Sequence, residues 1–471
     1  MDAKKVLAFS IGPISGAVLG LITLPIIAWY FSPEDIGRLT MLTVTISFSL
    51  LLFSLGLDQA YVREFHEVKD KPSLLKGVFL PGFILLTFSL VLLLLIPISI
   101  SKLLFDIESS LLSTLIICGI LLSFISRFLS LILRMQERGL AFSMSQLLPK
   151  LFFLLLILSF LLFNVPSVFE NLLIANILSL FAVFIIFVWN TRAEWMSAMK
   201  SLIDKSKQKQ MINYALPLIG SGLAFWGLTA IDKFFLRSLS SLSELGIYSV
   251  AVTFAGVALV FQSIFSTIWV PTVYKWIAEK VDLKKIKNIM DLVALAIILI
   301  WSVAGIFSWA VAYILPADYE NVQHILLLAI AYPLLYSLAE STGVGIGIER
   351  KTMFALLATV VALVVNVICN WFLIPIYGAA GAAMGSAVAF SIFFIIRTEA
   401  SSRLWMSFER HRMYIFIIML LTLSLFVNIV DLNNFHTVIY GFILVCSVIV
   451  YRDQSLQIYQ FSQDKIKKIF K

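Results

Sequence analysis

Apolar runs recur from one end of the chain to the other, and each is about as long as the 20 residues that a helix needs to cross a hydrocarbon core of about 30 Å. The chain has 471 residues, of which 61% are hydrophobic and 13% are charged. Ordinary soluble domains contain about 45–50% apolar and about 25% charged residues. The sequence therefore predicts an all-α polytopic membrane protein.

Fourteen such runs predict about 14 transmembrane helices. They lie at 8–31, 39–62, 77–97, 111–133, 144–163, 171–190, 213–237, 247–273, 289–314, 324–347, 354–375, 382–397, 413–431 and 437–451. The first run is too long, and too poorly followed by a small-residue cleavage site, to be a removable signal peptide. We therefore expect it to be part of the structure.

Lysine and arginine are concentrated in alternate connections between the runs. Cytoplasmic loops carry the excess of these residues, so their distribution predicts orientation. With both termini in the cytoplasm, 30 of the 35 basic residues fall in inward loops, tails or inner span ends, including Lys150 and Arg397. The other five are Arg38, Lys102, Arg127, Lys233 and Arg237. The formal charge of +8 is thus mainly a topology signal, with a contribution to contacts with anionic lipid head groups, rather than evidence of nucleic-acid binding.

The longest inward connection, residues 191–210, divides the chain into two parts. Trp195, Met199, Leu202 and Ile203 recur there at helical spacing against a lysine-rich face, which is typical of a helix lying in the membrane interface. We expect an N-terminal six-helix bundle (1–190), a cytoplasmic linker with this interfacial helix (191–212), a C-terminal six-helix bundle (213–400), and two further transmembrane helices with a basic cytoplasmic tail (401–471).

The two bundles resemble each other in sequence. GPISG at 12–16 and FSPEDIG at 31–37 in the first bundle correspond to LPLIG at 216–220 and LSSLSELGIYSV at 239–250 in the second. Each unit has a proline near the start of a span, a short acidic outer turn, and a glycine that starts the next span. Two similar halves that both start from the cytoplasmic side predict parallel repeats, with the substrate path between them.

Signatures of enzymatic chemistry are absent from the sequence. It has no G-x-x-x-x-G-K-[ST] motif for ATP, no H-E-x-x-H motif for zinc, and no loop large enough for a catalytic pocket outside the membrane. The three cysteines lie inside apolar runs, and the four histidines are scattered among loops and span ends. We therefore expect no enzyme activity, no cofactor and no metal site.

The seventh run holds three charges, within the segment LTAIDKFFLRSL at 228–239. An ionised group at the bilayer centre costs about 2.5–3.5 kcal/mol, so such residues usually line a protein interior or a wet cavity. At about 100° per residue, Lys233 and Arg237 lie about 40° apart on one helical face, with Asp232 about 100° from Lys233. Two alternatives remain, because Arg237 could snorkel to the outer head groups and Asp232 with Lys233 could be a purely structural ion pair.

Two other spans each contain a charge. Arg127 lies on the same face as Arg134, with Ser123 and Ser130 beside it, and is a candidate anion contact in a cavity if it does not snorkel. Glu340 precedes a glycine-rich stretch in the tenth run. It is a candidate proton relay, and the alternative is a neutral glutamic acid hydrogen-bonded to a neighbouring helix.

Polar residues also occur in the eleventh run and at the end of the second. Asn366 and Asn370 are four residues apart and share a helical face, where hydrogen bonding between helices is the ordinary explanation and substrate contact the alternative. The segment GLDQAYVREFHE at 56–67 places its charges near the interface, where charge costs little. On physical grounds alone it is a weak functional signal.

Three segments together resemble a known family of transporters. They are GLDQAYVRE at the end of the second run, IDKFFLRSLSSLSELGIYSVA at 231–251 and NVICNWFLIPIYGAAGAAMGSA at 366–387. They are similar to segments of the Wzx-type oligosaccharide flippases, which form the polysaccharide-transporter branch of the MOP exporter superfamily that also contains the MATE multidrug exporters. The resemblance extends from residue 1 to about residue 400, and the last two spans are less diagnostic.

The resemblance implies a MATE-like fold, in which two six-helix bundles form a V and alternate between inward-open and outward-open states, followed here by two C-terminal helices. Members move a polyprenyl-diphosphate-linked oligosaccharide to the outer leaflet of the bacterial cytoplasmic (inner) membrane for assembly of O-antigen, capsule or related surface polysaccharides. The partners implied are this lipid-linked substrate, membrane lipids, a coupling H⁺ or Na⁺, and glycan polymerase or assembly proteins.

The resemblance also gives the intramembrane charges a role. A cavity lined by Arg127, Lys233 and Arg237 would offset the desolvation of a diphosphate through charge-assisted hydrogen bonds. The resemblance also implies cation antiport, with Asp232 or Glu340 as the titrating group. Asn366 and Asn370 are expected to be polar residues of the cavity or to pack helices together. Asp58 and Arg63 are expected to form a motif at the cytoplasmic gate.

Three other functions compete with this interpretation. A MATE-type exporter of cationic drugs or lipids would favour acidic and aromatic cavity residues, whereas three of the charges singled out here are basic. A membrane glycan polymerase or ligase would need a larger outer loop for its catalytic residues. A scaffold that does not transport would still support surface glycan when Arg127, Lys233 and Arg237 are all replaced by alanine.

Overall fold

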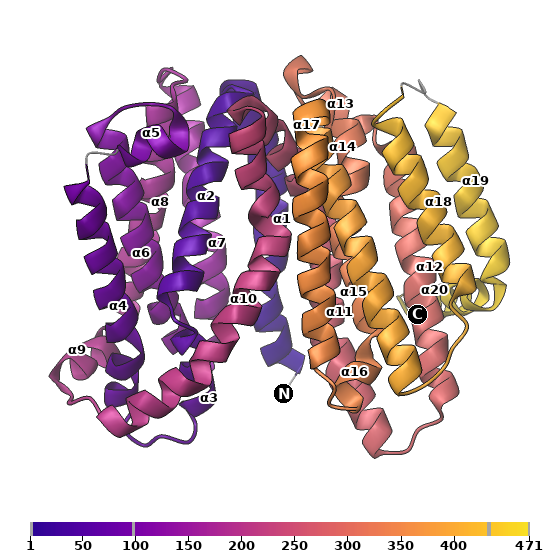
Figure 1. Ribbon diagram of the computed structural model, residues 1–471, viewed down its shortest axis with the longest axis horizontal. Coiled ribbons are helices and arrows are strands. Elements are labelled where there is room, and N and C mark those ends of the chain that lie inside the picture. The colour runs from indigo at the N-terminus through magenta and orange to yellow at the C-terminus, as the bar shows by residue number, and fades with distance from the viewer. Residues whose placement is uncertain (1–2, 97–98, 431–434, 470–471) are drawn as a thin grey trace. The chain divides into compact units, whose positions relative to one another are not determined.

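The computed structural model describes residues 3–96, 99–430 and 435–469, and every regular element in these residues is a helix (Figure 1). The predicted all-α fold is therefore confirmed. Residues 97 and 431, which end two of the predicted apolar runs, lie outside the described residues. Contacts divide the chain into two compact units, Met1–Ser249 and Val250–Lys471, here called the first and second unit.

The first unit contains ten complete helices among its described residues, several of which run side by side, as α2, α6 and α8 do (Figure 1). They are α1 (Ala3–Tyr30), α2 (Pro33–Phe53), α3 (Leu57–Glu64), α4 (Lys71–Leu95), α5 (Ile100–Phe105), α6 (Ser110–Met135), α7 (Gly139–Leu162), α8 (Phe169–Asn190), α9 (Arg192–Lys200) and α10 (Lys205–Leu239). Helix α11 (Leu242–Ala278) begins in this unit and continues into the second.

The second unit continues with helices that pack mainly on α17 and α12. They are α12 (Leu283–Phe307), α13 (Ala310–Ile314), the 3₁₀ turn η1 (Ala317–Tyr319), α14 (Val322–Ala329), α15 (Ala331–Thr342), α16 (Val344–Ile348), α17 (Met353–Leu404), α18 (His411–Val427), α19 (Phe435–Val450) and α20 (Arg452–Ile469). The apolar core of this unit includes Trp301, whose indole N–H donates to Ser424 at 3.2 Å.

Helices in the described residues account for each of the fourteen predicted spans. Ten are long and apolar enough to cross a membrane, and the bent pair Phe435–Val450 and Arg452–Gln460 could supply an eleventh. The shorter apolar helices Ile14–Tyr30 and His411–Val427 coincide with the first and thirteenth predicted runs. One helix, α17, is 52 residues long and covers the eleventh and twelfth runs. The chain is a multi-pass membrane protein.

A break at Gly378 divides α17 into two arms. Its backbone has φ 52° and ψ −126°, a conformation that a residue with a Cβ avoids. Pro375, just before it, cannot donate the backbone hydrogen bond of a continuous helix. Because of this break, one long helix can occupy the place of two predicted spans.

The helix predicted to lie in the membrane interface is shorter than its apolar spacing predicts. Helix α9 ends at Lys200, because Ser201 is extended with ψ 155°. Leu202 lies beyond the helix and is 88% exposed. Two residues later, Asp204 caps α10 by accepting a hydrogen bond from the amide of Lys207 at 3.0 Å. Because Asp204 caps α10, the chain leaves the helical conformation before it, and Leu202 and Ile203 are not part of α9.

The contact division falls after the predicted linker rather than in it. Helix α10 packs on α2, α3 and α4, and therefore groups with the first unit although it follows residues 191–212. The predicted domain ranges describe repeats in sequence, whereas the contact units describe packing, so those ranges remain predictions.

Candidate functional site

An ion pair inside the first unit joins Arg127 to Asp58. Arg127 lies in the half of α6 nearer its C-terminus, and its Nη2 donates to Oδ2 of Asp58 on α3 at 2.8 Å. The amide of Gln59 approaches the same carboxylate oxygen at 3.3 Å. Asp58 is buried, with 7% of its surface exposed, whereas the side chain of Arg127 is 40% exposed. The arginine is therefore held on one side and accessible on the other.

Arg127 lines two cavities of similar size. One has a volume of about 350 Å³ and is also lined by Asp58, Gln59, Ser47 and Ser54. The other has a volume of about 340 Å³, and its polar residues come from α6 and α7. They are Ser123, Ser126, Ser130, Ser145 and Gln146. An arginine surrounded by hydroxyl and amide groups can bind an anion while neighbouring groups bind hydroxyl-rich parts of the same ligand.

Lys150 is a second cation in the interior of a span. It is the twelfth residue of α7, about 16 Å along the helix axis from Gly139. Its Nζ donates to the carbonyl oxygen of Gly16 on α1 at 2.8 Å, and its surface is partly open. The prediction placed Lys150 at the inner end of the fifth run. The helix instead begins five residues before that run, so that Lys150 lies near its middle.

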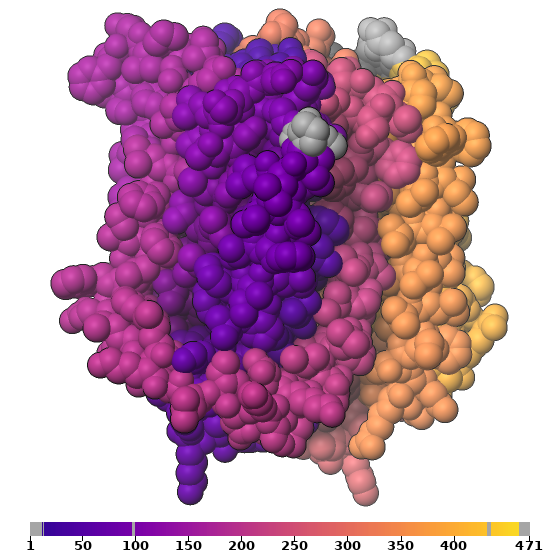
Figure 2. Space-filling model, turned by 60° about the vertical axis from the view of Figure 1, so that its left-hand side comes forward, coloured from indigo at the N-terminus to yellow at the C-terminus, as the bar shows by residue number. Residues whose placement is uncertain are grey.

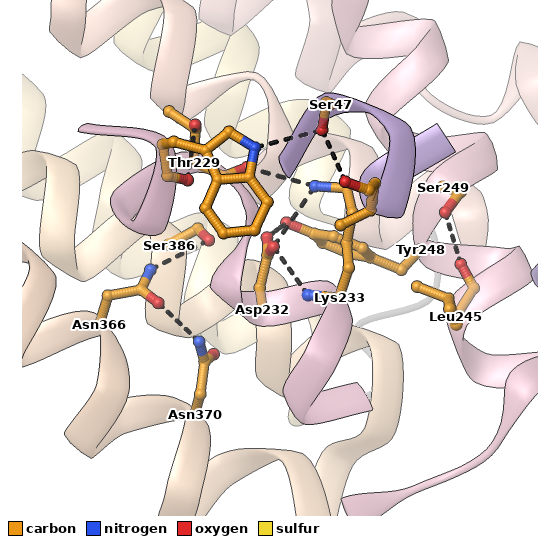
Figure 3. Close-up of polar contacts among 12 residues, drawn as sticks. Ser47, Thr229, Asp232, Lys233, Leu245, Tyr248, Ser249, Asn366, Asn370 and Ser386 are labelled. Atoms are coloured by element: carbon orange, nitrogen blue, oxygen red, sulfur yellow. Dashed lines mark hydrogen bonds and ion pairs between the residues drawn. The ribbon is translucent and has the colours of Figure 1, made fainter. Parts of the chain in front are cut away.

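Asp232, Lys233 and Tyr248 meet in a compact cluster (Figure 3). Asp232 on α10 is 2% exposed and accepts a hydrogen bond from the hydroxyl of Tyr248 on α11. The Nζ of Lys233 lies 3.3 Å from Oδ1 of Asp232 and 5.5 Å from the centre of the Tyr248 ring. The same Nζ donates to the carbonyl of Thr229 at 3.2 Å. The lysine charge is thus largely neutralised by local partners.

Arg237 lies one turn after Lys233, in the last turn of α10, and contacts the end of α5. Its guanidinium pairs with Asp106 and donates to the carbonyl of Leu104 at 3.3 Å. These groups stand at the C-terminus of α5, where unpaired carbonyls favour a cation. Although Lys233 and Arg237 are four residues apart, they have different acceptors, and Arg237 caps a short helix.

The two charges of the predicted gate motif, Asp58 and Arg63, have separate partners. Asp58 pairs with Arg127, as described above, whereas the guanidinium of Arg63 lies 4.3 Å from the ring centre of Tyr214 on α10. A cation stacked on an aromatic face links α3 to the first half of α10. Arg63 is therefore a contact between elements of the first unit.

Glu340 in the second unit has polar neighbours on three helices. Its Oε2 accepts a hydrogen bond from Ser266 on α11. Tyr336, one turn earlier on α15, and Arg397 on α17 both lie close enough to interact electrostatically with it. Arg397 was predicted to face the cytoplasm from a loop, but α17 continues to Leu404 and carries it beside α15. Glu340 is consequently not a lone carboxylate.

Asn366 and Asn370 form a buried ladder between the two arms of α17. The Nδ2 of Asn370 donates to Oδ1 of Asn366 at 2.6 Å, and Nδ2 of Asn366 donates to Ser386 at 3.3 Å (Figure 3). Both asparagines are fully buried. This geometry is that of hydrogen bonding between packed helix arms, the ordinary explanation given above.

Among the described residues there is no cluster of three or more histidine, cysteine, aspartate or glutamate side chains that could hold a metal ion.

Of the site residues predicted from the sequence, the structure brings together Asp58 with Arg127, Asp232 with Lys233, and Asn366 with Asn370. Lys150 and Arg397 were missed as interior charges. The sequence did contain a signal for an interior charge at both positions. Each basic residue directly follows apolar residues that continue a helix, with a proline just before Lys150.

The described helices match solved membrane transporters and flippases in fold. The lipid II flippase MurJ, in an inward-closed conformation, superposes with a TM-score of 0.66 at 15% identity, covering 98% of this chain and 100% of that one. An inward-facing multidrug resistance MATE family transporter of the MOP superfamily gives 0.57 at 15% identity, covering 83% and 96%. The Vibrio cholerae MATE transporter VcmN gives 0.52 at 16% identity, covering 86% and 97%. The fold is therefore that of the MurJ and MATE transporters, as expected.

Sequence comparison assigns the chain to a family, whereas the comparison of structures identifies only its fold. Residues 3–277 match the family described as polysaccharide biosynthesis protein. The chain belongs to the polysaccharide biosynthesis protein family, so the resemblance inferred from its motifs is confirmed at the level of family. No curated protein matches the sequence significantly.

Proposed function

We propose that this protein is a flippase that moves a polyprenyl-diphosphate-linked oligosaccharide from the cytoplasmic to the outer leaflet by alternating access. The observation that carries the proposal is the position of Arg127, a partly exposed cation on the wall shared by two polar cavities in the first unit. Membership of the polysaccharide biosynthesis protein family supports a glycan substrate. The name of MurJ as a lipid II flippase supports a lipid-linked one.

Arg127 has the chemistry that a diphosphate requires. A guanidinium binds phosphate oxygens through two parallel hydrogen bonds, and such bonds strengthen where water is excluded. In the absence of an anion, Asp58 neutralises the arginine at 2.8 Å. Substrate would bind at the open side of the guanidinium while Asp58 keeps its contact, so that neither Arg127 nor Asp58 would be left as an isolated charge.

The serines and Gln146 that line the 340 Å³ cavity suit the sugar end of the same substrate. Hydroxyl and amide groups both donate and accept hydrogen bonds, as sugar hydroxyls do. Lys150, one helical turn after Gln146, would add a second cation for the diphosphate. The polyprenyl tail would remain in the lipid.

Lys233 and Arg237, the other two predicted substrate contacts, have weaker support. Lys233 shares its charge with Asp232, and Arg237 caps α5 together with Asp106. We therefore assign the main anion contact to Arg127, with Lys233 as a secondary contact that could act when its pairing with Asp232 loosens.

Cation antiport would supply the driving force, and Glu340 is the better of the two candidate coupling groups. Asp232 is almost fully buried between Lys233 and the Tyr248 hydroxyl. Glu340 is more accessible and lies among Ser266, Tyr336 and Arg397 on separate helices. A change in its charge would alter contacts among α11, α15 and α17 together, which is how a local event biases a conformational equilibrium.

The setting proposed for this activity is the bacterial inner membrane, with both chain termini in the cytoplasm and glycan polymerase or other assembly proteins as partners. The product would enter O-antigen, capsule or a related surface polysaccharide. A MATE-type exporter of cationic compounds remains the alternative. Arg127 weighs against it, because a cation on a cavity wall repels a cationic cargo.

Deletion of the gene tests the proposal. We expect completed lipid-linked oligosaccharide to accumulate on the cytoplasmic side and mature surface polymer to disappear, and complementation with the wild-type chain to restore both. The accumulated lipid is identified chemically, which also defines the repeat unit. Normal surface glycan in a deletion strain that lacks any redundant flippase would contradict the assignment.

A further inference from the structure

An apolar cavity lies against α9 in the first unit. Figure 2 turns toward the viewer the side of this unit that carries α4. Its volume is about 410 Å³, and its wall comes from α4, α6, α8 and α9. The side chains that define it are Phe79, Phe128, Phe184, Trp195, Ala198 and Met199. It is separate from both cavities that Arg127 lines.

The polar groups on this cavity wall are already satisfied elsewhere. The indole N–H of Trp195 donates to the carbonyl of Val188 at 3.0 Å. Lys76 contributes its stem to the wall, while its Nζ donates to the carbonyls of Met199 at 3.0 Å and Ser201 at 2.7 Å, at the end of α9. The surface facing the cavity is consequently hydrocarbon, which does not hold water but does hold apolar ligands.

Hydrogen bonds to α4 hold α9 and the residues that follow it in place, so that α9 forms one wall of this cavity. Besides Lys76, the hydroxyl of Ser73 donates to the carbonyl of Leu202 at 2.8 Å, and the amide of Gln208 donates to the carbonyl of Gly77 at 2.9 Å. The edges of this wall of the cavity are thus held by polar contacts with α4.

The surroundings of the cavity are those of a membrane interface. Trp189 is 67% exposed, and the guanidinium of Arg192 stacks on its ring at 4.6 Å. Met199 is 69% exposed on α9 and Lys200 is also exposed. Aromatic residues and exposed basic residues together are typical of the level of the lipid head groups. The basic residues complement anionic head groups, which are enriched in the cytoplasmic leaflet.

We propose that this cavity binds one acyl chain of an anionic phospholipid from the leaflet at the α9 end, with Arg192 and Lys200 near its head group. The bilayer supplies this ligand at high local concentration, and the cavity offers it a wall without unsatisfied polar groups. A bound chain would support α9, and with it the connection that leads into α10. The proposal does not depend on the transport activity or on the identity of the transported substrate.

Photolabelling of the full-length protein in vesicles tests this site. The vesicles contain phosphatidylcholine with a small fraction of phosphatidylglycerol that carries a diazirine near the end of one acyl chain. We expect labelled peptides to be enriched in the cavity walls of α4, α6, α8 and α9 relative to exposed surfaces such as α19. Equal labelling of all lipid-facing helices would overturn the proposal.

Two substitutions from different helices fill the cavity, Ala198→Phe on α9 and Leu129→Trp on α6, both of which replace buried residues. Each methylene excluded from an apolar site weakens binding about fourfold, so we expect labelling of the cavity walls to fall on the order of tenfold. Leu92→Trp adds comparable bulk at a lipid-facing position of α4 and is the matched control. Unchanged wall labelling in both filled variants would contradict the site, and Leu129→Trp decides the result if Ala198→Phe displaces α9.

A separate measurement tests whether Arg192 and Lys200 lie near an anionic head group. Replacing Arg192 and Lys200 together with glutamine should abolish the preference for labelled phosphatidylglycerol over an equally labelled phosphatidylcholine. Lys102→Gln, an exposed lysine at the far end of the same unit, should leave the preference intact. A polyprenyl phosphate that displaces the phospholipid probe more effectively than unlabelled phosphatidylglycerol would overturn the choice of ligand.

Discussion

Gly37 and Gly246 pack against each other's helix in the first unit, at equivalent positions of the sequence repeat. Each is the fifth residue of its helix, α2 or α11. A methyl group on Gly37 would overlap the carbonyl of Leu242, and one on Gly246 would overlap the carbonyl of Pro33. Each added carbon would also lie 3.2 Å from the amide nitrogen of the other glycine. The repeat therefore provides two glycines for one symmetric helix crossing.

Alanine at either glycine should weaken this crossing. The overlap is with backbone, which cannot move aside as a side chain can, so we expect Gly37→Ala and Gly246→Ala each to lower stability by about 1–3 kcal/mol, the usual cost of overpacking. Thermal unfolding of the purified protein in detergent measures the change. In contrast, Gly256→Ala in the same α11 meets nothing within 4 Å and serves as the control.

The control should be neutral or stabilising, because alanine is favoured over glycine in a helix interior by about 1 kcal/mol. If Gly37→Ala and Gly246→Ala unfold at the same temperature as Gly256→Ala, the crossing is not closely packed in the protein. The double variant should be less destabilised than the two single effects added together, because both substitutions open the same contact.

The ion pair of Asp58 and Arg127 should be separable into a structural and a transport component. Arg127→Met leaves the carboxylate of Asp58 buried without its partner, a change that costs about 3–5 kcal/mol at buried sites. We expect Asp58→Asn to cost less, because Arg127 is partly open to water. The double variant Asp58→Asn with Arg127→Met should recover most of the stability lost in Arg127→Met alone.

Transport should respond differently from stability in these variants. Hydrogen bonds to charged groups contribute about 1.5–3 kcal/mol, so loss of the arginine should lower flipping about tenfold to a hundredfold even in the stable double variant. Flipping is measured with lipid-linked oligosaccharide in proteoliposomes. Recovery of transport together with stability would mean that Arg127 has only a structural role.

The sequence predicted the fold well because the bilayer imposes a local rule. A span of about 20 apolar residues is readable without knowing its neighbours, and each predicted run is covered by one or more helices or by an arm of α17. The position at which a helix ends depends in addition on contacts made by residues beyond that helix. The run over 195–203 lost its last residues to the cap that Asp204 makes on α10. The break at Gly378, in contrast, falls in the gap between the predicted runs 354–375 and 382–397.

Partners across the bundle could not be read from the chain in the same way. Helical spacing placed Lys233 and Arg237 on one face, but Lys233 donates to Asp232 and Thr229 on its own helix, whereas the acceptors of Arg237 lie at the end of α5. Asp58 is 69 positions from Arg127, and no local pattern connects the two. Arg397 was assigned to a loop because hydropathy ends at a charge, whereas the helix continues beyond it.

Lys150 should contribute to transport more than to stability. Its contact in the described structure is a single carbonyl, that of Gly16, at 2.8 Å. We expect Lys150→Met to fold normally and to lower flipping of the lipid-linked oligosaccharide about tenfold, and Lys150→Arg to retain most activity because the charge remains. Lys102→Met, a lysine that is 65% exposed, is the control for loss of one positive charge.

A result in which Lys150→Met and Lys150→Arg transport equally well would exclude a role for this charge in binding the substrate. A fall in melting temperature for both variants, with transport reduced in proportion, would instead assign Lys150 to the packing of α1 on α7. Measurement of flipping and unfolding on the same preparations separates these cases.

Glu340 should determine how transport responds to an ion gradient. Glu340→Gln keeps the size and hydrogen-bonding capacity of the side chain but cannot change charge, so we expect flipping to continue at a reduced rate that no longer depends on an imposed pH or sodium gradient. Glu340→Asp should retain part of the dependence. Ser266→Ala removes the hydroxyl that donates to Glu340 without removing the carboxylate, and should shift the gradient at which transport is half-maximal rather than abolish the response. Proteoliposomes with defined gradients provide the measurement, and a Glu340→Gln protein that follows the gradient as the wild type does would transfer the coupling role to Asp232.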